Sequence, residues 1–528
     1  MESLHGSDWD LVIAGTGLAP SLFALAVSRS GLRILHVDHH EYYGGDEAAL
    51  SLSEAEAWAA AHSGDSKEDT STSTAFAPRC FSHATVTRID DGGEGANLPR
   101  RLGPQRAYSL ALAPQIIYSR SNLVSALVSS HTHSQLEFQA VGSWFLASGS
   151  SSSPNLSRVP GGREDVFQDA TLDLHAKRSL MKFLRFVGNY EEKENEWREW
   201  KDLPLPTALE QKFGLPPAFH GPLIALTLSA SLPNDITAAE ALPRVARHLR
   251  SIGIFGAGFA AVFPKFGGLA EVAQIACRAC AVGGGVYVLG KGVSSVDETP
   301  GDDLTLQLSG GETVTTKRLV GSLGDLPLAV TNNTAWRTLV RGIYIVSGPL
   351  SPLFPSTSEG GVTPAGAVVV VPSTSEPAGP PIHILAHSSE SGDCPSAQCV
   401  LYASTILSET TGSEDVDVDA MHRLDDAVAL VLRSTLTTPT DGGESNAECS
   451  QLQVLWKLHY RHAVPQRQSS ERHEGDGRIL TLPHVSLDLA LEDSVLGNVE
   501  SVWAKAIEGE EQGRFLRFES RGGMGDDE

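Results

Sequence analysis

The sequence predicts an α/β fold in which a sheet domain of the Rossmann type is interrupted by a smaller, mostly helical domain. Three observations predict it. A strand, a glycine turn, a helix and a second strand follow one another within the first forty residues, and such a βαβ unit implies a parallel sheet. Helical patterns dominate residues 156–252, and β-branched, strand-like runs return after residue 253.

The opening segment has the clearest local signal. Residues 10–14 are apolar enough for a buried strand, and residues 15–17 form a glycine turn. Residues 20–30 have a helical pattern, and residues 33–37 have the pattern of a second short strand. Because parallel strands need a crossover connection, the helix is expected to cross between two neighbouring strands of one sheet.

The glycine turn raises the question of a bound dinucleotide. Gly15, Gly17 and the Asp38 that ends the second strand stand where a dinucleotide-binding fingerprint has two of its glycines and its ribose-binding acid. Pro20 replaces the third glycine, and its ring crowds the turn and removes a backbone donor. Two alternatives follow: a bound FAD or NAD, or an FAD/NAD(P)-binding-like fold whose crevice has lost its ligand. We expect the second, with no cofactor.

Composition shifts predict the domain boundaries. The first part of the α/β domain is expected at residues 1–155, with a mobile polar insertion at about 53–103, where Ser, Thr, Asp, Glu and Gly leave few apolar side chains for a core. The helical domain is expected at residues 156–252. Residues 253–520 are expected to complete the α/β domain, and residues 521–528 to form a disordered tail.

Charge and composition exclude several classes of function. Sixty-four acidic against forty basic residues give a formal net charge of −24, which opposes nucleic-acid binding because phosphates need clustered cations. Six cysteines in 528 residues are no disulfide framework, and the first residues lack the apolar stretch of a signal peptide. The apolar runs are far shorter than the roughly 20 residues that cross a bilayer. We therefore expect a cytosolic protein that meets membranes only through a partner.

Short catalytic and metal-binding motifs are also missing from the sequence. It contains no zinc-protease, nucleophile-elbow or P-loop motif. Cys277 and Cys280 lie in the middle of a predicted helix without a second pair at zinc-binding spacing, so packing is the expected role of both. We expect no catalytic residue and no metal site.

Three blocks of sequence carry a resemblance to a known family. The first, residues 8–52, contains the G-T-G-L turn, an S-x-x-G-x-x-[IV]-L-H-[VM]-D segment and the run Tyr42-Tyr43-Gly44-Gly45. The others are residues 110–127 and 263–289. In order and composition these blocks resemble the Rab escort protein and Rab GDP-dissociation inhibitor family. The resemblance implies a non-catalytic protein whose α/β domain binds a GDP-bound Rab GTPase.

The resemblance also implies a set of Rab-binding positions: Tyr43, Arg106, Glu271, Arg278 and Val288. Glu271 and Arg278 are seven residues apart on one predicted helix, so after about two turns they point in the same direction. Without the family resemblance, an intramolecular ion-pair arrangement on a solvated helix would explain the two charges as well.

The helical domain resembles the escort-protein branch of the family. In the segment that corresponds to residues 159–186, escort proteins have an aromatic residue and, eleven residues later, an arginine that bind the α subunit of Rab geranylgeranyltransferase. The matching positions are Phe167 and Arg178. Residues 171–190 form the strongest amphipathic pattern of the chain, with Arg178, Lys182 and Arg185 on one face. By periodicity alone, that face could simply be solvated.

The resemblance therefore implies an accessory component that presents a newly made Rab to the transferase heterodimer. The apolar interior of the helical domain would then shelter the geranylgeranyl lipid on the Rab during delivery to a membrane. Two alternatives stay open. One is a GDP-dissociation inhibitor that recycles prenylated Rabs, and the other is a flavin oxidase of the amine-oxidase type, since family members share that fold.

Overall fold

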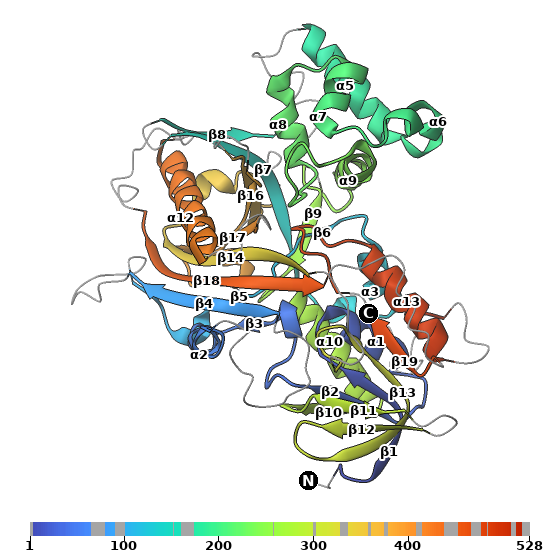
Figure 1. Cartoon of the computed structure of the whole chain (residues 1–528). Coiled ribbons are helices and arrows are strands. Elements are labelled where there is room, and N and C mark those ends of the chain that lie inside the picture. Colours follow the sequence, from blue (N-terminus) through green and yellow to red (C-terminus); the bar gives the residue numbers. More distant parts are fainter. Residues whose placement is uncertain are drawn as a thin grey trace, which may run out of the picture.

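In the residues that it describes, the computed structural model contains two large sheets, a small two-stranded sheet and a helical segment (Figure 1). The structure describes residues 4–64, 80–89, 101–150, 153–159, 174–256, 258–298, 303–327, 336–356, 361–373, 379–407, 414–437, 452–465, 477–482, 484–507 and 514–519. The predicted tail at 521–528 and the aromatic docking residue Phe167 lie outside these residues. No helix of the described part combines the length and apolarity needed to span a bilayer.

The first sheet confirms the predicted βαβ unit. Its strands are ordered β10-β2-β1-β13-β12-β11, and β19 also pairs with β13. The pairs among β10, β2, β1, β13 and β19 are parallel, whereas β11 and β12 form an antiparallel hairpin at the edge. The strands are β1 (Ser7–Ala14), β2 (Ile34–Asp38), β10 (Val286–Leu289), β11 (Val293–Asp297), β12 (Leu304–Leu308), β13 (Thr313–Ser322) and β19 (Ile479–Leu482).

Three helices cover one face of the first sheet: α1 (Leu18–Val27), α10 (Leu269–Val282) and α13 (Ser494–Ala506). All ten residues of α1 are buried, because it packs between the sheet and the other two helices. The short helix α3 (Asn122–Ser129) adds Leu123 and Leu127 to the same core. Since α10 is the outer neighbour of α1 beside β2 and β10, its far side faces solvent.

The second sheet is larger and mostly antiparallel, and the sequence patterns had not separated it from the first. Its strands are ordered β4-β18-β14-β17-β16-β15-β7-β9-β6, with β8 beside β7. They are β4 (Phe81–Arg88), β6 (Ile117–Tyr118), β7 (Phe138–Ser150), β8 (Ser153–Arg158), β9 (Ala261–Pro264), β14 (Trp336–Ser347), β15 (Gly366–Val371), β16 (Ile382–Ser388), β17 (Gln398–Ile406) and β18 (Val454–Pro465). The helix α12 (Glu414–Thr437) packs on one face, and a small two-stranded sheet joins β3 (Ala49–Leu50) to β5 (Leu110–Ala111).

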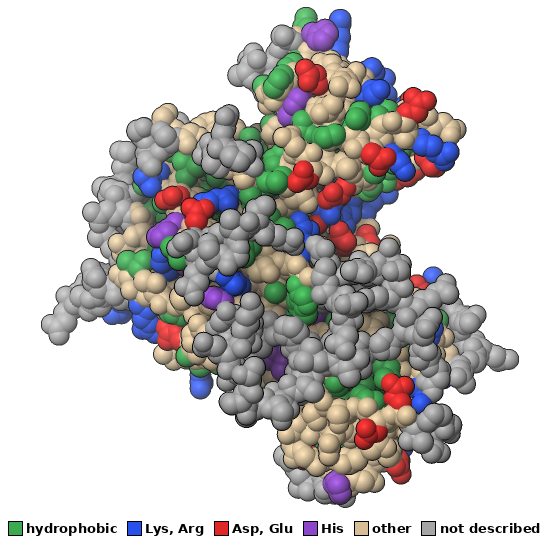
Figure 2. All heavy atoms as spheres, in the orientation of Figure 1, with side chains coloured by type: hydrophobic (Ala, Val, Ile, Leu, Met, Phe, Trp, Pro, Cys, Tyr) green, Lys and Arg blue, Asp and Glu red, His purple; other side chains and the backbone are tan. Residues whose placement is uncertain are grey.

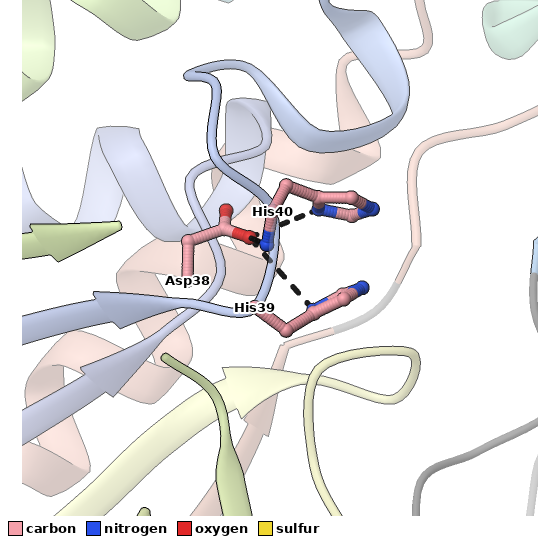
Figure 3. A group of neighbouring side chains, drawn as sticks. All are labelled: Asp38, His39 and His40. Carbon is pink, nitrogen blue, oxygen red and sulfur yellow. Dashed lines mark hydrogen bonds and ion pairs between the residues drawn. The ribbon is translucent and has the colours of Figure 1, made fainter. Parts of the chain in front are cut away.

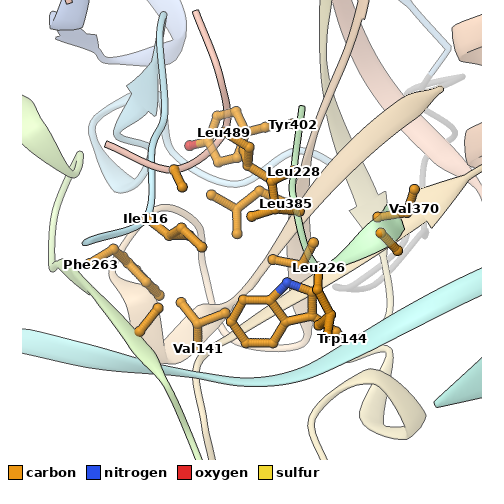
Figure 4. Close-up of a cluster of buried hydrophobic side chains, with 14 of the residues drawn as sticks. Ile116, Val141, Trp144, Leu226, Leu228, Phe263, Val370, Leu385, Tyr402 and Leu489 are labelled. Atoms are coloured by element: carbon orange, nitrogen blue, oxygen red, sulfur yellow. The ribbon is translucent and has the colours of Figure 1, made fainter. Parts of the chain in front are cut away.

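The helical segment lies between β8 and β9 and projects from the second sheet (Figure 1). It contains α5 (Leu174–Gly188), α6 (Glu194–Trp197), α7 (Leu205–Phe213), α8 (His220–Ala225) and α9 (Ala238–Ser251). Its core is continuous with that of the sheet. Figure 4 shows the junction, where Trp144 of β7 lies close to Leu226, which follows α8, in a cluster that also contains Leu228 and Phe263 of β9.

The prediction of one mobile polar insertion over residues 53–103 is wrong at 53–64 and 80–89. The helix α2 (Leu52–Ala61) occupies the first part, and β4 occupies the second. Trp58 of α2 and Phe81 of β4 are buried, with ring centroids 5.1 Å apart. The polar composition concealed these elements because a few buried side chains anchor each of them to the second sheet.

The N-terminus of α2 is held by a capping box. The Ser51 hydroxyl accepts a hydrogen bond from the Glu54 amide at 3.4 Å, and the Glu54 carboxylate accepts one from the Ser51 amide at 2.8 Å. Hydrogen bonds with Ser51 lower the pKa of Glu54.

Replacing the capping serine is expected to destabilise the protein. Ser51→Ala leaves the Glu54 amide without its side-chain acceptor and should lower the free energy of unfolding by about 1 kcal/mol. Urea denaturation followed by tryptophan fluorescence measures the change. The control is Ser63→Ala, which removes an exposed hydroxyl near the other end of α2 and should change that free energy by less than about 0.5 kcal/mol. Equal effects of the two variants would contradict a stabilising cap.

Candidate binding surfaces

The solvent-facing side of α10 carries two of the predicted Rab-binding residues. Glu271 is half-buried and Arg278 is exposed, with the exposed Gln274 between them. The spacings of three and four residues place all three on one side of the helix. Burial raises the pKa of Glu271. Within the described residues neither charged group has an ion-pair partner, and seven residues of helix separate the two by about 10 Å along the axis. Among the described residues the structure therefore contains no ion pair of Glu271 or Arg278 that would correspond to this alternative.

Tyr43 lies next to α10 although the two are far apart in the sequence. Its ring centroid is 6.1 Å from that of Tyr287 on β10. The pKa of Tyr43 is raised by its burial and by the nearby Cys277 of α10. Burial, with Cys277 and Cys280 beside it, also raises the pKa of Tyr287. Tyr43, Glu271 and Arg278 thus belong to one surface, which we call the platform.

Val288 lies at the edge of this surface but faces the other side of the sheet. It follows Tyr287 on β10 and aligns with Val37 of β2, and successive side chains of a strand point to opposite faces. Tyr287 packs with the core beneath α10, whereas Val288 packs with the core on the opposite face. The structure therefore does not bring Val288 onto the α10 face, although β10 is the edge strand there.

The segment that carries Arg106 contacts the turn before α10, at the margin of the platform. Arg106 is exposed on the short 3-10 helix η2 (Gln105–Ala107). Three residues later, the Ser109 hydroxyl donates a hydrogen bond to the Phe266 carbonyl at 2.7 Å. Gly267 follows with φ +121°, and a Cβ there would lie 2.4 Å from the Ala49 Cβ. Only glycine allows this close approach, which holds the segment carrying Arg106 against the start of α10.

Three exposed apolar residues near the platform were not predicted from the sequence. Phe266, Val282 and Val286 expose 51%, 69% and 40% of their surface. They lie before α10, at its last residue and at the start of β10. Apolar side chains beside Arg278 and Glu271 give the platform the mixed character that protein interfaces have. A sequence pattern predicts that apolar residues such as these are part of the core. Only the fold shows that no helix or strand of the described residues covers them.

A second candidate surface is a groove of about 830 Å³ on the helical segment. It is lined by Leu174, Lys177, Arg178, Met181, Lys182, Arg185, Phe186, Lys193, Glu196, Trp200, Lys212 and Phe213. Six of these residues are basic and one is acidic, in a chain of net charge −24. Figure 2 shows basic side chains over the helical segment, at the top of the view, among acidic and apolar ones.

The floor of the groove is aromatic. Lys182 Nζ lies 5.8 Å from the Phe213 ring centroid, and Lys193 Nζ lies 5.5 Å from that of Phe186. Arg178 is exposed on α5, within the groove, and Leu174 at the start of α5 exposes 75% of its surface. A basic rim around an apolar floor suits an acidic partner that also offers an apolar anchor. The structure thus places Arg178 in a concave surface.

The crevice at the carboxyl end of β1 is filled by the chain's own acidic groups. The amide of Leu18, at the start of α1, donates a hydrogen bond to Glu47 Oε2 at 2.8 Å. A Cβ on Gly15 would lie 2.0 Å from Asp325 Oδ2, so this carboxyl lies directly against the glycine turn. Burial and the adjacent Asp46 raise the pKa of Glu47 to about 7, and burial together with Asp38 raises that of Asp325.

The acid in the ribose position is also engaged within the chain. Asp38 Oδ2 accepts hydrogen bonds from the Thr16 amide and hydroxyl at 2.7 and 2.6 Å, and Oδ1 accepts from the His40 amide at 2.7 Å. Figure 3 shows that the rings of His39 and His40 both contact this carboxylate, with Nδ1 of His40 2.9 Å and Nδ1 of His39 3.8 Å from Asp38 Oδ1. Although burial opposes it, hydrogen bonding and the nearby His40 lower the pKa of Asp38 to about 2. Glu47 and Asp325 thus occupy the position where a dinucleotide would bind its diphosphate, and Asp38, the acid that would bind the ribose, is already hydrogen-bonded within the chain. The residues present therefore do not fit that cofactor.

Comparisons with known proteins agree with the resemblance described above. Residues 5–74 and 90–434 match the family model described as GDP dissociation inhibitor. Rab proteins geranylgeranyltransferase component A of Saccharomyces cerevisiae is 30% identical over 292 residues, which cover 55% of this chain and 44% of that protein. The chain thus spans less than half the length of this relative. The Drosophila melanogaster protein of the same name is 27% identical over 432 residues, or 81% of this chain and 80% of its own.

Among solved structures, the Rab GDI of Plasmodium falciparum has the same fold. The comparison has a TM-score of 0.61 with 18% sequence identity, and it covers 95% of this chain and 98% of that one. At this level of identity the match bears on the fold alone. It supports the expected combination of a Rossmann-type sheet with a helical segment.

Proposed function

The chain belongs to the GDP dissociation inhibitor family, and from this membership we propose that it acts as a Rab escort protein, the accessory component A of Rab geranylgeranyltransferase. The observation that carries the proposal is the basic groove around Arg178. The relatives named component A point to the same branch of the family. In this role the protein would take part in protein geranylgeranylation and vesicle transport.

In the proposed mechanism the platform binds a newly made Rab in its GDP form. Arg278, Glu271 and Tyr43 contact the GTPase, with Arg106 at one margin and the edge strand β10 at the other. Exposed apolar side chains beside Arg278 supply area that is removed from water on binding. The family supplies this assignment, and the common surface of Tyr43, Glu271 and Arg278 supports it.

The groove then recruits the transferase. Phe167 and Arg178 bind the α subunit of the α/β heterodimer, so that the Rab tail and the active site are held in one complex. This raises the effective concentration of the tail at the catalyst. The escort contributes no reactive group, because bond formation takes place on the transferase.

After transfer, the helical segment shelters the lipid until the Rab reaches a membrane. Removing a twenty-carbon chain from water contributes on the order of 10 kcal/mol at about 0.8 kcal/mol per carbon, before the ordering costs are subtracted. Phe183 and Leu209 fill the interior between α5 and α7. The lipid therefore enters only if these helices separate. The protein works in the cytosol and meets membranes transiently through prenylated Rab.

Family membership also favours a second candidate function, recycling of prenylated Rab as a GDP-dissociation inhibitor. Such a protein extracts prenylated Rab from membranes but does not support prenylation. The two functions therefore differ in their need for the transferase, and the groove around Arg178 is the surface that an escort requires and a recycling inhibitor does not.

Reconstituted prenyl transfer tests the proposal. Unmodified Rab·GDP, transferase heterodimer and labelled geranylgeranyl diphosphate are combined with and without this protein. An escort makes lipid incorporation into Rab depend on its addition. If incorporation is unchanged while prenylated Rab is extracted from vesicles, the protein is a recycling inhibitor.

A further inference from the structure

Three side chains from distant parts of the chain converge beside the filled crevice. They are Asp46 on the 3-10 helix η1 (Gly45–Glu47), Cys80 directly before β4, and His484 between β19 and α13. One donor atom from each lies within 4.8 Å of the other two. We propose that Asp46, Cys80 and His484 bind a divalent metal ion, with Zn²⁺ as the preferred ion.

The donor set and its spacing fit zinc. Thiolate, imidazole and carboxylate are the protein ligands of Zn²⁺, at about 2.3, 2.0 and 2.1 Å. In a tetrahedral site, ligand atoms at these distances lie about 3.3 to 3.8 Å from one another. Asp46 Oδ2 is 3.3 Å from His484 Nδ1, so this pair is already at that separation. Three protein ligands leave a fourth position for water.

Cys80 and His484 both lie against Gly324. A Cβ added to Gly324 would lie 3.2 Å from Cys80 Sγ and 3.2 Å from His484 Nε2. Both side chains therefore pack closely against this glycine, where the side chain of any other residue would crowd them. The His484 atom that faces Asp46 Oδ2 is Nδ1, at 3.3 Å, so Nδ1 is the ligand atom of this histidine. The other ring nitrogen, Nε2, lies against Gly324 and is buried without a hydrogen-bond partner within the described residues.

A neighbouring histidine lies beside the Asp46 carboxylate. Arg341 Nε donates a hydrogen bond to His462 Nδ1 at 3.1 Å. The proton of the neutral ring is therefore on Nε2, which lies 3.6 Å from Asp46 Oδ2. The His462 side chain is 3% exposed, and its Nε2 has no hydrogen-bond partner in the described part of the chain. The buried imidazole thus lies beside the carboxylate, although at 3.6 Å it makes no hydrogen bond with it.

The charges around the cluster also favour a cation. Asp38, Glu47 and Asp325 are close enough to Asp46 to act on one another electrostatically, and all are buried or nearly so. A divalent ion would balance this concentration of acidic groups. The group of Asp38, His39 and His40 is a weaker candidate, because the Asp38 oxygens already accept hydrogen bonds from Thr16 and His40 (Figure 3).

A metal ion at this position would cross-link three separate segments. One of them carries Tyr43, three residues before Asp46. Because the free chain must bring these segments together, an ion that binds only the folded state stabilises it. We expect Zn²⁺ to raise the thermal midpoint of the metal-free protein by several degrees, and this holds whether or not the protein binds Rab.

Cobalt substitution tests the site in the full-length protein. Metal ions are removed from the protein with a chelator, and after dialysis the protein is titrated with Co²⁺. The absorption spectrum of bound Co²⁺ depends on the ligands that hold it. One equivalent should bind, with a thiolate-to-cobalt charge-transfer band in the near ultraviolet and the intense visible bands of low-symmetry, four-coordinate cobalt. Zn²⁺ should displace it. Absence of the thiolate band in the wild-type titration overturns the proposal without any variant.

Variants assign the ligands. Cys80→Ser should abolish the charge-transfer band, and His484→Ala should weaken Zn²⁺ binding at least tenfold. The matched control is Cys277→Ser, which removes a buried thiol of α10 outside the cluster and should keep the band. A band that survives Cys80→Ser, or disappears in Cys277→Ser with folding intact by circular dichroism, places the metal elsewhere and overturns the assignment.

Discussion

Arg178→Ala is expected to abolish the stimulation of geranylgeranyl transfer while leaving the affinity for GDP-bound Rab unchanged. Arg178 lies in the basic groove of the helical segment, away from the α10 surface. Arginine at the centre of an interface contributes about 2 to 4 kcal/mol, so the affinity for the transferase should fall by roughly 30- to 1000-fold. Initial rates of lipid incorporation, at transferase concentrations below saturation, measure the loss.

A matched surface arginine controls for nonspecific charge effects. Arg198→Ala also removes an exposed basic residue from the helical segment, but Arg198 pairs with Glu194 at 2.9 Å and does not line the groove. It should stimulate transfer normally. Phe167→Ala, at the aromatic docking position, should behave like Arg178→Ala. Normal stimulation by Arg178→Ala would remove the docking assignment, and lost Rab binding would show that the variant disturbs the fold.

Arg278→Ala is expected to weaken Rab·GDP binding by about 1 to 3 kcal/mol, or about 5- to 150-fold in Kd. The guanidinium lies on the solvent-facing side of α10 without an ion-pair partner in the described residues, so its charge is available to a partner. Its removal should also reduce the salt dependence of association. Isothermal calorimetry at two ionic strengths measures both effects.

The control for this variant is Lys505→Ala. Lys505 is an exposed cation in the last turn of α13. The helix α13 covers β19 on the same face of the sheet, but away from β10 and the platform. Its removal should leave the Rab affinity within twofold of wild type. An unchanged Kd for a folded Arg278→Ala protein, or an equal loss for Lys505→Ala, would mean that the contact lies elsewhere.

Local patterns predicted part of the platform. The βαβ unit was expected from a strand, a glycine turn and a helix, and the parallel pairing of β1 with β2 confirms it. The common side of Glu271 and Arg278 followed from helical periodicity alone. Both predictions depend on residues that are close together in the sequence, because the periodicities of helices and strands repeat every few residues.

Other parts of the site depended on contacts that the sequence does not encode locally. The polar composition of residues 53–103 gave no sign of α2 and β4, because Trp58 of α2 and Phe81 of β4 become buried only when these two elements pack together in the fold. The resemblance implied Val288 as one of the Rab-binding positions, but strand alternation turns its side chain to the face of the sheet opposite α10. Phe266 and Val282 resembled core positions because they are apolar, and only the fold shows that they are exposed.

The sequence by itself determined the family, the first βαβ unit, and a helix with its charged residues on one side, since these follow from motifs and short periodicities. The tertiary structure decided what occupies the crevice: Glu47 reaches the start of α1 from 29 residues away, and Asp325 reaches Gly15 from the turn after β13. It also brought Asp46, Cys80 and His484 together. Segments so far apart in the chain come together only because folding buries the apolar side chains of the two cores. Local sequence patterns do not show this contribution to the free energy of folding.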